Sequence, residues 1–203
     1  MTLKESNKVR LSSLLLSLLP LAFGLPASSW ATDADVEKVF ATISAKGTKF
    51  ENKDFRLRLL PRTPNQIVAF YEARGFPAFA LDEVRKVCFI TVGLGNRSKE
   101  KIFHDLSEWK FVDKNGPVQR ILRSDWKQRW NKLGLEKRFQ STFRWTLMPE
   151  KLDFYPLEGE GGNIIFPRSG QPITIIAKVK TGEAKLKIYQ VKFENVECAK
   201  DPS

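Results

Sequence analysis

Residues 171–180 read QPITIIAKVK, and this stretch decides the class of fold. The residues between the apolar positions include a threonine and two lysines. Because successive side chains of a strand point to opposite faces, this alternation predicts a β-strand with one face in a core. The apolar face holds every second residue: Ile173, Ile175, Ala177 and Val179.

Further strands are predicted on both sides of this one. The segment 138–147 (RFQSTFRWTL) alternates most regularly, with Phe139, Phe143 and Trp145 on its apolar side. Residues 84–94 (VRKVCFITVGL) are apolar on both faces, which predicts a central strand covered on two sides. The remaining predicted strands lie at about residues 55–60, 101–112, 118–122, 163–166 and 184–194.

Three segments show the helical period instead. Residues 33–46 carry an apolar stripe and predict an N-terminal helix. Residues 64–74 follow Thr63 and contain Gln66 at the third helical position, which together predict a capped helix start. A short helix is predicted at 125–133 (DWKQRWNKL).

Seven or eight short strands with turns between them predict a mainly β protein. The expected architecture is an antiparallel β-sandwich (immunoglobulin-like) or an open barrel, with two or three short peripheral helices. A doubly wound parallel sheet is disfavoured, because the strands alternate and no strand is followed by a Gly-rich turn and a helix.

The first 31 residues resemble an export signal. Lys4, Lys8 and Arg10 precede an apolar run that ends in small residues up to Ala31. The run is shorter than the ~20 residues of a spanning helix, so cleavage is preferred over an uncleaved anchor. We therefore expect a cleaved signal peptide at 1–31, a single domain at 32–203 without a transmembrane segment, and a periplasmic or secreted location.

The two cysteines, Cys88 and Cys198, are expected to form a disulfide. In an oxidising compartment paired cysteines are commoner than free ones. Two separate buried thiols are the alternative.

The charge balance is strongly basic. The net charge is +11, and removal of residues 1–31 takes away three of 34 Lys and Arg and one of 23 acids, which leaves +9. A basic surface attracts anions, and outside the cytoplasm these are envelope glycans, lipid surfaces or acidic proteins rather than nucleic acid. The alternative is a solvated surface that serves only solubility.

The residues offer little for metal or nucleophilic chemistry. The single histidine, His104, is expected to be a half-exposed strand residue. No zinc-ligand spacing, G-x-S-x-G motif or phosphate-binding loop is present, so we predict no metal and no cofactor. The predicted loop 149–162 carries oxygen ligands that fit calcium or a carboxylate-dependent hydrolase, without matching a known spacing: Asp153, Glu158, Glu160 and Asn163.

Tryptophan and arginine cluster in one region of the chain. Arginine beside tryptophan can stack and can bind carboxylate or phosphate with two hydrogen bonds, and both residues dominate binding surfaces. The alternative is that the tryptophans only anchor a short helix to the core. The candidate binding residues are Arg123, Trp126, Arg129, Trp130, Arg138 and Arg144. Arg56 and Arg58 would form a second basic patch if their strand shared a sheet with 138–147.

Three functions follow, in order of preference. The first is an exported, non-catalytic interaction or assembly module of the cell envelope, which binds another protein through a sheet edge or the Trp/Arg surface. The second is a binder of an anionic glycan, lipopolysaccharide or lipid headgroup surface. The third is the carboxylate-dependent hydrolase.

Overall fold

The computed structural model describes residues 41–182 and 187–202. The expected signal peptide and most of the expected N-terminal helix at 33–46 lie outside these residues. Where the structure does describe that segment, the helix prediction is wrong: Ala41–Ser44 is strand β1. It pairs in parallel with strand β11 (Lys187–Val196), so a tertiary pairing overrides the local helical pattern.

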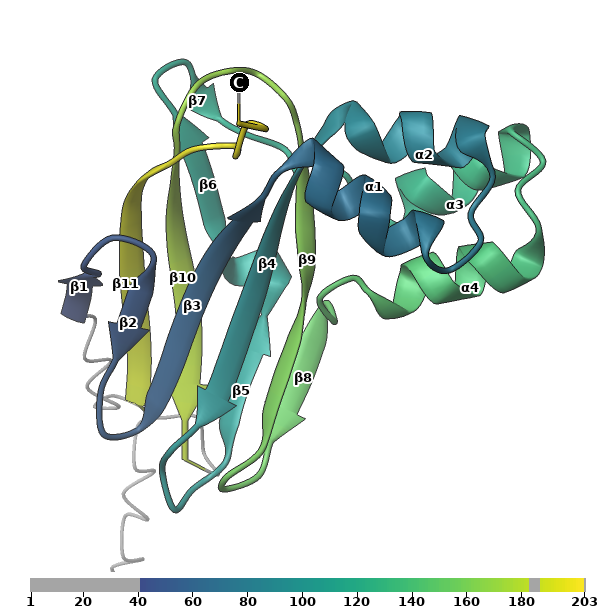
Figure 1. The fold of residues 1–203 in the computed structure, drawn as a ribbon. Helices are drawn as coiled ribbons and strands as arrows, with labels where there is room; N and C mark the ends of the chain where they lie inside the picture. The colour runs from purple at the N-terminus through teal and green to yellow at the C-terminus, as the bar shows by residue number, and fades with distance from the viewer. Residues whose placement is uncertain (1–40, 183–186, 203) are drawn as a thin grey trace, which may run out of the picture. The chain divides into compact units, whose positions relative to one another are not determined.

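Two sheets form the body of the protein (Figure 1). Sheet A has seven strands in the order β1, β11, β10, β5, β8, with β6 also paired to β10 and β7 paired to β6. Besides β1 and β11, its strands are β5 (Ile102–Asp105), β6 (Lys110–Asp113), β7 (Gly116–Pro117), β8 (Lys151–Phe154) and β10 (Ile173–Thr181).

Sheet B has four strands in the order β2, β3, β4, β9, and all neighbours are antiparallel. Its strands are β2 (Lys49–Glu51), β3 (Phe55–Arg62), β4 (Val87–Asn96) and β9 (Gly159–Pro167).

The main core lies between the two sheets. Strand β10 buries every second residue from Ile173 to Thr181, as the alternation predicts, and β3 buries Phe55, Leu57 and Leu59 in the same way. The predicted mainly β sandwich with short peripheral helices is therefore confirmed, with four α-helices among the described residues instead of two or three.

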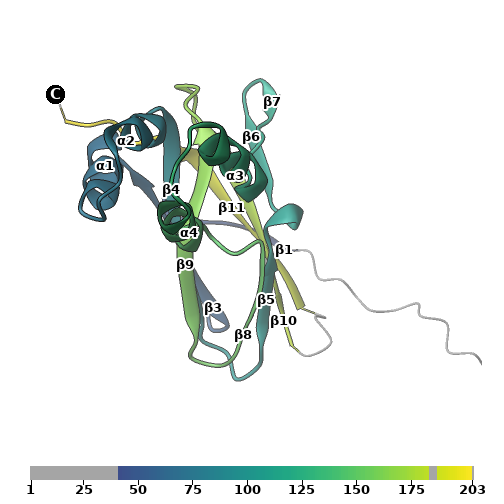
Figure 2. The ribbon, with the colours of Figure 1, turned by 90° about the vertical axis from the view of Figure 1, so that its right-hand side faces the viewer.

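The helices form a separate lobe beside one end of sheet B (Figures 1 and 2). One pair lies in the connection from β3 to β4, and the other lies in the connection from β7 to β8. The pairs pack on one another and on three residues of the outer face of sheet B, Val87, Phe89 and Ile165, and so make a second core. The helices are α1 (Pro64–Glu72), α2 (Ala78–Arg85), α3 (Arg123–Lys132) and α4 (Lys137–Trp145).

Most of the segment 138–147 belongs to helix α4, which ends at Trp145, so the strand predicted there is wrong. Phe139 and Phe143 are buried in the lobe core, and their spacing of four places them on one helical face. Leu147, just after the helix, is buried in the same core. A strand would also have buried Trp145, which is 77% exposed. The apolar residues of this segment fit the period of a strand and also that of a helix. Packing against the other helices favours the helix.

Other predicted boundaries also need correction. The strand predicted at 84–94 begins at Val87, because α2 occupies the residues before it. Residues 101–112 form β5 and β6 with a short 3₁₀ turn (Leu106–Glu108) between them. Residues 118–122 are not a strand, whereas the predicted loop 149–162 contains β8 and the start of β9.

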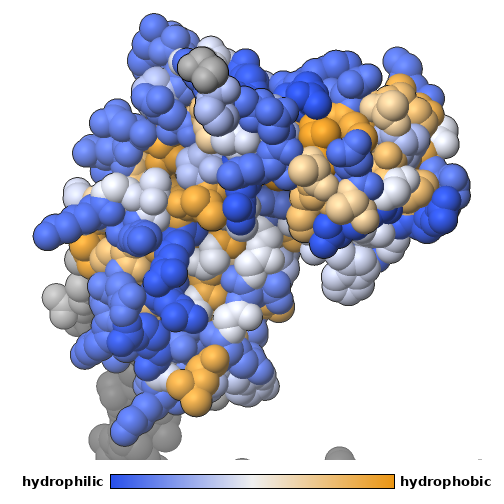
Figure 3. Space-filling model, in the orientation of Figure 1, coloured by the Kyte–Doolittle hydropathy of each residue, from blue (hydrophilic) through white to orange (hydrophobic). Residues whose placement is uncertain are grey.

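Part of the lobe surface is apolar. Phe70 of α1 and Phe79 of α2 are 38% and 42% exposed, and hydrophobic surface is visible over these helices in Figure 3. No helix within the described residues combines the length and the apolar character needed to cross a membrane.

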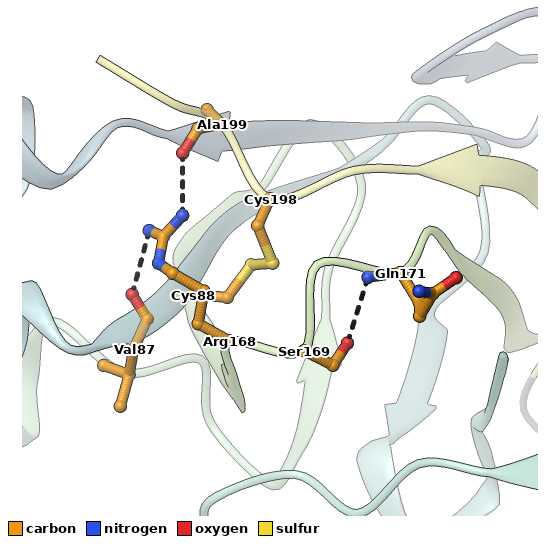
Figure 4. The surroundings of a disulfide bond; sticks show 7 residues. All are labelled: Val87, Cys88, Arg168, Ser169, Gln171, Cys198 and Ala199. Carbon is orange, nitrogen blue, oxygen red and sulfur yellow. Dashed lines mark hydrogen bonds between the residues drawn. A yellow bond between two sulfur atoms is a disulfide. The ribbon is translucent and has the colours of Figure 1, made fainter. Parts of the chain in front are cut away.

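A disulfide joins the two sheets near the lobe. Cys88 of β4 bonds Cys198, which follows β11, with the Cα atoms 5.4 Å apart (Figure 4). Arg168 holds the same segment, because its guanidinium donates to the carbonyl oxygens of Ala199 (3.1 Å) and Val87 (3.2 Å). The structure thus makes the cysteine pair that the sequence predicts.

Candidate functional site: a cationic cleft between two helices

A cleft of about 380 Å³ lies between α3 and α4. We call it the cationic cleft. Clefts of this size accept small molecules or parts of larger ones. Its lining residues are Arg123, Ser124, Trp126, Lys127, Trp130, Lys137, Gln140, Ser141, Phe143, Arg144 and Leu147.

Local sequence explains why two helices flank the cleft. Asp125 starts α3, because its carboxylate accepts a hydrogen bond from the backbone N–H of Leu122 (2.8 Å). Gly134, with a φ of 69°, ends it, since glycine adopts this left-handed conformation without strain. Arg123 donates to the carbonyl oxygen of Leu147 (2.8 Å), which ties the start of α3 to the residues just after α4.

The floor of the cleft is aromatic. The rings of Trp126 and Trp130 stack with centroids 4.9 Å apart, and Phe143 lies 4.7 and 5.2 Å from them. Both tryptophans are 1% exposed. Neither indole N–H has a hydrogen-bond partner, so contacts of the ring faces and edges hold the indoles in place. The aromatic rings thus lie directly beneath the cleft and make its base apolar.

The rim of the cleft is basic. Four cationic residues line it, Arg123, Lys127, Lys137 and Arg144, and no lining residue is acidic. Lys137 donates to the amide oxygen of Asn131 (2.9 Å), which leaves its charge uncompensated. Among the described residues, neither Lys127 nor Arg144 forms a salt bridge with a carboxylate. Charges of one sign around an apolar cleft concentrate the electrostatic field and attract anions.

The structure brings together four of the six binding residues predicted from the sequence. Arg123, Trp126, Trp130 and Arg144 line the cleft. Arg129 lies over the ring of Trp126 at 4.7 Å and pairs with Glu83 of α2 at 3.4 Å. The tryptophans are thus core anchors, as the alternative held, and they also form the floor of the cleft.

Arg138 lies outside the cleft, where it is exposed and paired with Glu136 (2.9 Å). The second basic patch expected from Arg56, Arg58, Arg138 and Arg144 does not form as one sheet surface. The first two lie on β3, whereas the last two lie on a helix.

Sequence reasoning missed Lys127 and Lys137. Lys127 follows Arg123 by four residues, and Lys137 precedes Arg144 by seven, so each pair shares one helical face. Recognition of α4 as a helix would have revealed the second pair.

The other predicted chemical groups lie elsewhere. His104 is 3% exposed, not half-exposed as expected, and neither ring nitrogen has a hydrogen-bond partner. Asp153 lies in a small cavity beside His104, whereas Glu160 lies in a groove on sheet B. The acids considered for hydrolysis therefore do not all share one cavity. In the part of the chain that the structure describes, no group of three or more His, Cys, Asp or Glu could hold a metal ion.

Comparison with known proteins identifies no family. No family model matches the chain, and no curated protein matches it. Among solved structures, the yjhA protein from Bacillus subtilis is similar with a TM-score of 0.40 and 10% identity, over 75% of this chain and 100% of that one. A second Bacillus subtilis structure, titled "putative lipoprotein (ycdA)", has the same score and identity over 74% of this chain and 39% of that one.

Proposed function

We propose that this protein binds an anionic amphiphile, a molecule with an apolar body and a carboxylate or phosphate head, in the cationic cleft. The observation that carries the proposal is the combination in one cleft of a stacked tryptophan floor and four cationic side chains without an acid. This is the lipid-headgroup form of the anion-binding function predicted from the sequence.

The two parts of the cleft suit the two parts of such a ligand. An apolar chain or ring would enter the cleft above the buried rings of Trp126, Trp130 and Phe143. It would lose its contact with water there, which favours binding in proportion to the area buried. The anionic head would remain at the rim, where Arg123 offers the guanidinium N–H groups that do not bond Leu147, and Lys127 offers a mobile ammonium. The basic rim alone would suit any anion, and the aromatic floor alone would suit any apolar molecule. Only the two together favour an amphiphile.

The proposed location is outside the cytoplasm. The disulfide between Cys88 and Cys198 supports an oxidising compartment, and the export-signal pattern of residues 1–31 supports the same location. Lipids with anionic headgroups are available there as ligands.

The test uses dodecyl phosphate below its micelle-forming concentration, with dodecyl maltoside as a neutral probe that has the same chain. Binding is followed by tryptophan fluorescence and by the indole N–H signals in NMR spectra. We expect the phosphate to shift the signals of Trp126 and Trp130. The double variant Lys127→Glu/Arg144→Glu should weaken binding by about tenfold or more, equal to about 1.4 kcal/mol or more.

Arg138→Glu is the matched control, because it makes the same kind of charge change on α4 outside the cleft. It should leave the affinity within about twofold. Equal affinity for both probes, or equal loss in the control and the double variant, would contradict the proposal.

The assembly-module function is kept as a second candidate because of Trp145. This side chain is 77% exposed at the end of α4, with the guanidinium of Arg144 at 5.7 Å from its ring, and exposed tryptophan beside arginine is typical of protein-binding hot spots. Cross-linked pull-down from the cell envelope with wild-type protein and with Trp145→Ser tests it. A partner that is retained at high salt and lost with Trp145→Ser would favour assembly, whereas a partner retained by both proteins would argue against a role for Trp145.

A further inference from the structure

We propose that the outer face of sheet B is a second binding site, which takes an extended acidic glycan. It goes beyond the function proposed for the cationic cleft and rests on different residues. The site is a groove formed by two adjoining cavities that share Gly161, and we call it the sheet B groove. Its principal lining residues are Arg56, Arg58, Arg62, Thr91, Gly93, Gly95, Gly159, Gly161, Asn163 and Phe70.

The floor of the groove is made of glycine. In the register of β4 and β9, Gly93 lies opposite Gly161 and Gly95 lies opposite Gly159. All four have the same parity as Phe89 and Ile165, which face the helical lobe, so they belong to the outer face of the sheet. At Gly93 no side chain covers the sheet backbone, so a ligand can approach it there, whereas the side chain of Arg56 covers Gly95.

Packing does not explain Gly93. A Cβ atom added there would meet nothing within 4 Å, and its φ is not among the positive values of the chain. Glycine weakens the interior of a strand relative to residues with a side chain. A glycine that the fold does not need, at the centre of an exposed sheet face, indicates that the space above it is used.

Arginine flanks the glycine floor. Arg58 and Arg56 of β3 lie opposite Gly93 and Gly95 in the register, and the side chain of Arg56 extends over Gly95. Both arginines are exposed, and no salt bridge with an acid is found for either within residues 41–182 and 187–202. Figure 3 shows hydrophilic surface over β3 beside a paler strip over β4 and β9.

Three arginines lie on the outer face of β3, with the exposed Leu60 between the second and the third. Arg56 and Arg58 lie two positions apart, about 6.6–6.8 Å along this face, and Arg62 follows four positions after Arg58, about 13 Å farther toward the lobe. Such an arrangement matches repeated negative charges along an extended chain better than a single anion. Glu160 is the one acid that lines the groove, and its carboxylate accepts a hydrogen bond from the backbone N–H of Gly161 (3.0 Å).

The end of the groove near the lobe offers fixed polar groups. Arg62 donates to the hydroxyl of Thr91 (3.0 Å), which donates to the side-chain oxygen of Asn163 (2.7 Å). Phe70 of α1 forms an apolar wall next to them. Fixed hydroxyl and amide groups beside an aromatic ring suit the hydroxyls and the ring faces of a sugar.

An extended peptide would fit this face less well. Peptides that add to a sheet use the unpaired backbone groups of an edge strand. β4 is paired on both sides, with β3 and with β9, so its backbone N–H and C=O groups are not available to pair with a peptide over the groove. A glycan binds through its own hydroxyl and carboxylate groups and does not require backbone pairing.

The test uses an oligomer of galacturonic acid, with a neutral oligosaccharide of equal length as the uncharged probe, and calorimetry as the readout. Gly93→Ala and Gly93→Val fill the floor progressively and should weaken binding of the acidic oligomer, by tenfold or more for valine. Their unfolding midpoints should equal or exceed that of the wild type. Arg58→Glu should also lower the affinity at least tenfold, and Arg138→Glu should leave it unchanged.

Several outcomes would overturn the proposal. These are absence of binding, unchanged affinity in Gly93→Val and Arg58→Glu, or equal affinity for the neutral oligosaccharide. Tighter binding of poly-glutamate or inorganic polyphosphate would assign the groove to another class of anion. Dodecyl phosphate binding distinguishes the two sites. The Gly93 variants should still bind dodecyl phosphate, because the cationic cleft does not include Gly93. If the wild type does not bind dodecyl phosphate, the proposal for the cationic cleft is refuted and the proposal for the sheet B groove is unaffected.

Discussion

The single histidine of the chain should make stability depend on pH. His104 lies in β5 between β8 and β10, with its ring 5.8 Å from Phe154 and 6.3 Å from Trp109. Burial lowers the pKa of His104 from 6.5 to about 4, and the nearby carboxylates of Asp105, Glu150 and Asp153 oppose this change only in part.

The sign and size of the effect follow from proton linkage. As the pH falls through 6.5, the unfolded chain takes up a proton on His104, whereas the folded protein does so only near pH 4. The unfolded state is therefore favoured progressively across this window. Because one pKa unit corresponds to about 1.4 kcal/mol, the free energy of unfolding should fall by about 2.5 kcal/mol between pH 7 and 4.5.

Urea unfolding at intervals from pH 7 to pH 4.5 measures this loss, with His104→Gln and His104→Leu as the comparison. Each variant will have its own stability at pH 7, but its dependence on pH should be flatter than that of the wild type. Carboxylates begin to titrate toward the acid end of this range, and the difference between the wild type and the variants isolates the contribution of His104. Equal losses in the wild type and both variants, or an NMR titration of folded His104 near 6.5, would refute the reasoning.

Three further predictions concern stability and are checked by chemical unfolding. Reduction of the disulfide between Cys88 and Cys198, 110 residues apart, should lower the free energy of unfolding by up to ~4–5 kcal/mol, and equal midpoints with and without reductant would contradict this. Thr63→Ala removes a capping box in which both hydrogen bonds measure 3.2 Å and should cost about 1 kcal/mol, whereas no change would mean that the cap is dispensable. Trp126→Ala should cost about 3–5 kcal/mol because the ring is buried, and Trp145→Ala should change stability by less than about 0.5 kcal/mol; similar costs for the two would contradict the assigned burial.

The parts of the fold that depend on local signals could be predicted. Strand β10 follows from its alternation, and helix α1 begins at Pro64 after the Thr63 cap, as the sequence indicates. Helix α4 could not be predicted in this way, because Phe139, Phe143 and Leu147 satisfy the period of a strand as well as that of a helix. Contacts with the neighbouring α3 and with α1, which is distant in the chain, favour the helix.

The candidate site was predictable to a similar extent. Composition alone indicated the tryptophan and arginine cluster around Trp126 and Trp130. Arg129 and Arg138 lie outside the cleft because of the side of α3 and α4 on which they stand. That could not be predicted from an interpretation of residues 138–147 as a strand. The glycines of the sheet B groove give no sequence signal, because Gly93 and Gly161 become neighbours only through the pairing of β4 with β9.

The lobe is assembled from two insertions that are far apart in the chain, and this has a consequence for the order of folding. Tyr71 of α1 stacks on Phe143 of α4 with centroids 5.4 Å apart, and its hydroxyl bonds that of Thr146 (2.6 Å), 75 residues away. Closing such a loop costs entropy before any contact stabilises it. The lobe also needs Ile165 of β9 as part of its base. Its helices should therefore gain protection from hydrogen exchange later in refolding than the hairpin of β10 and β11, whose pairing is local.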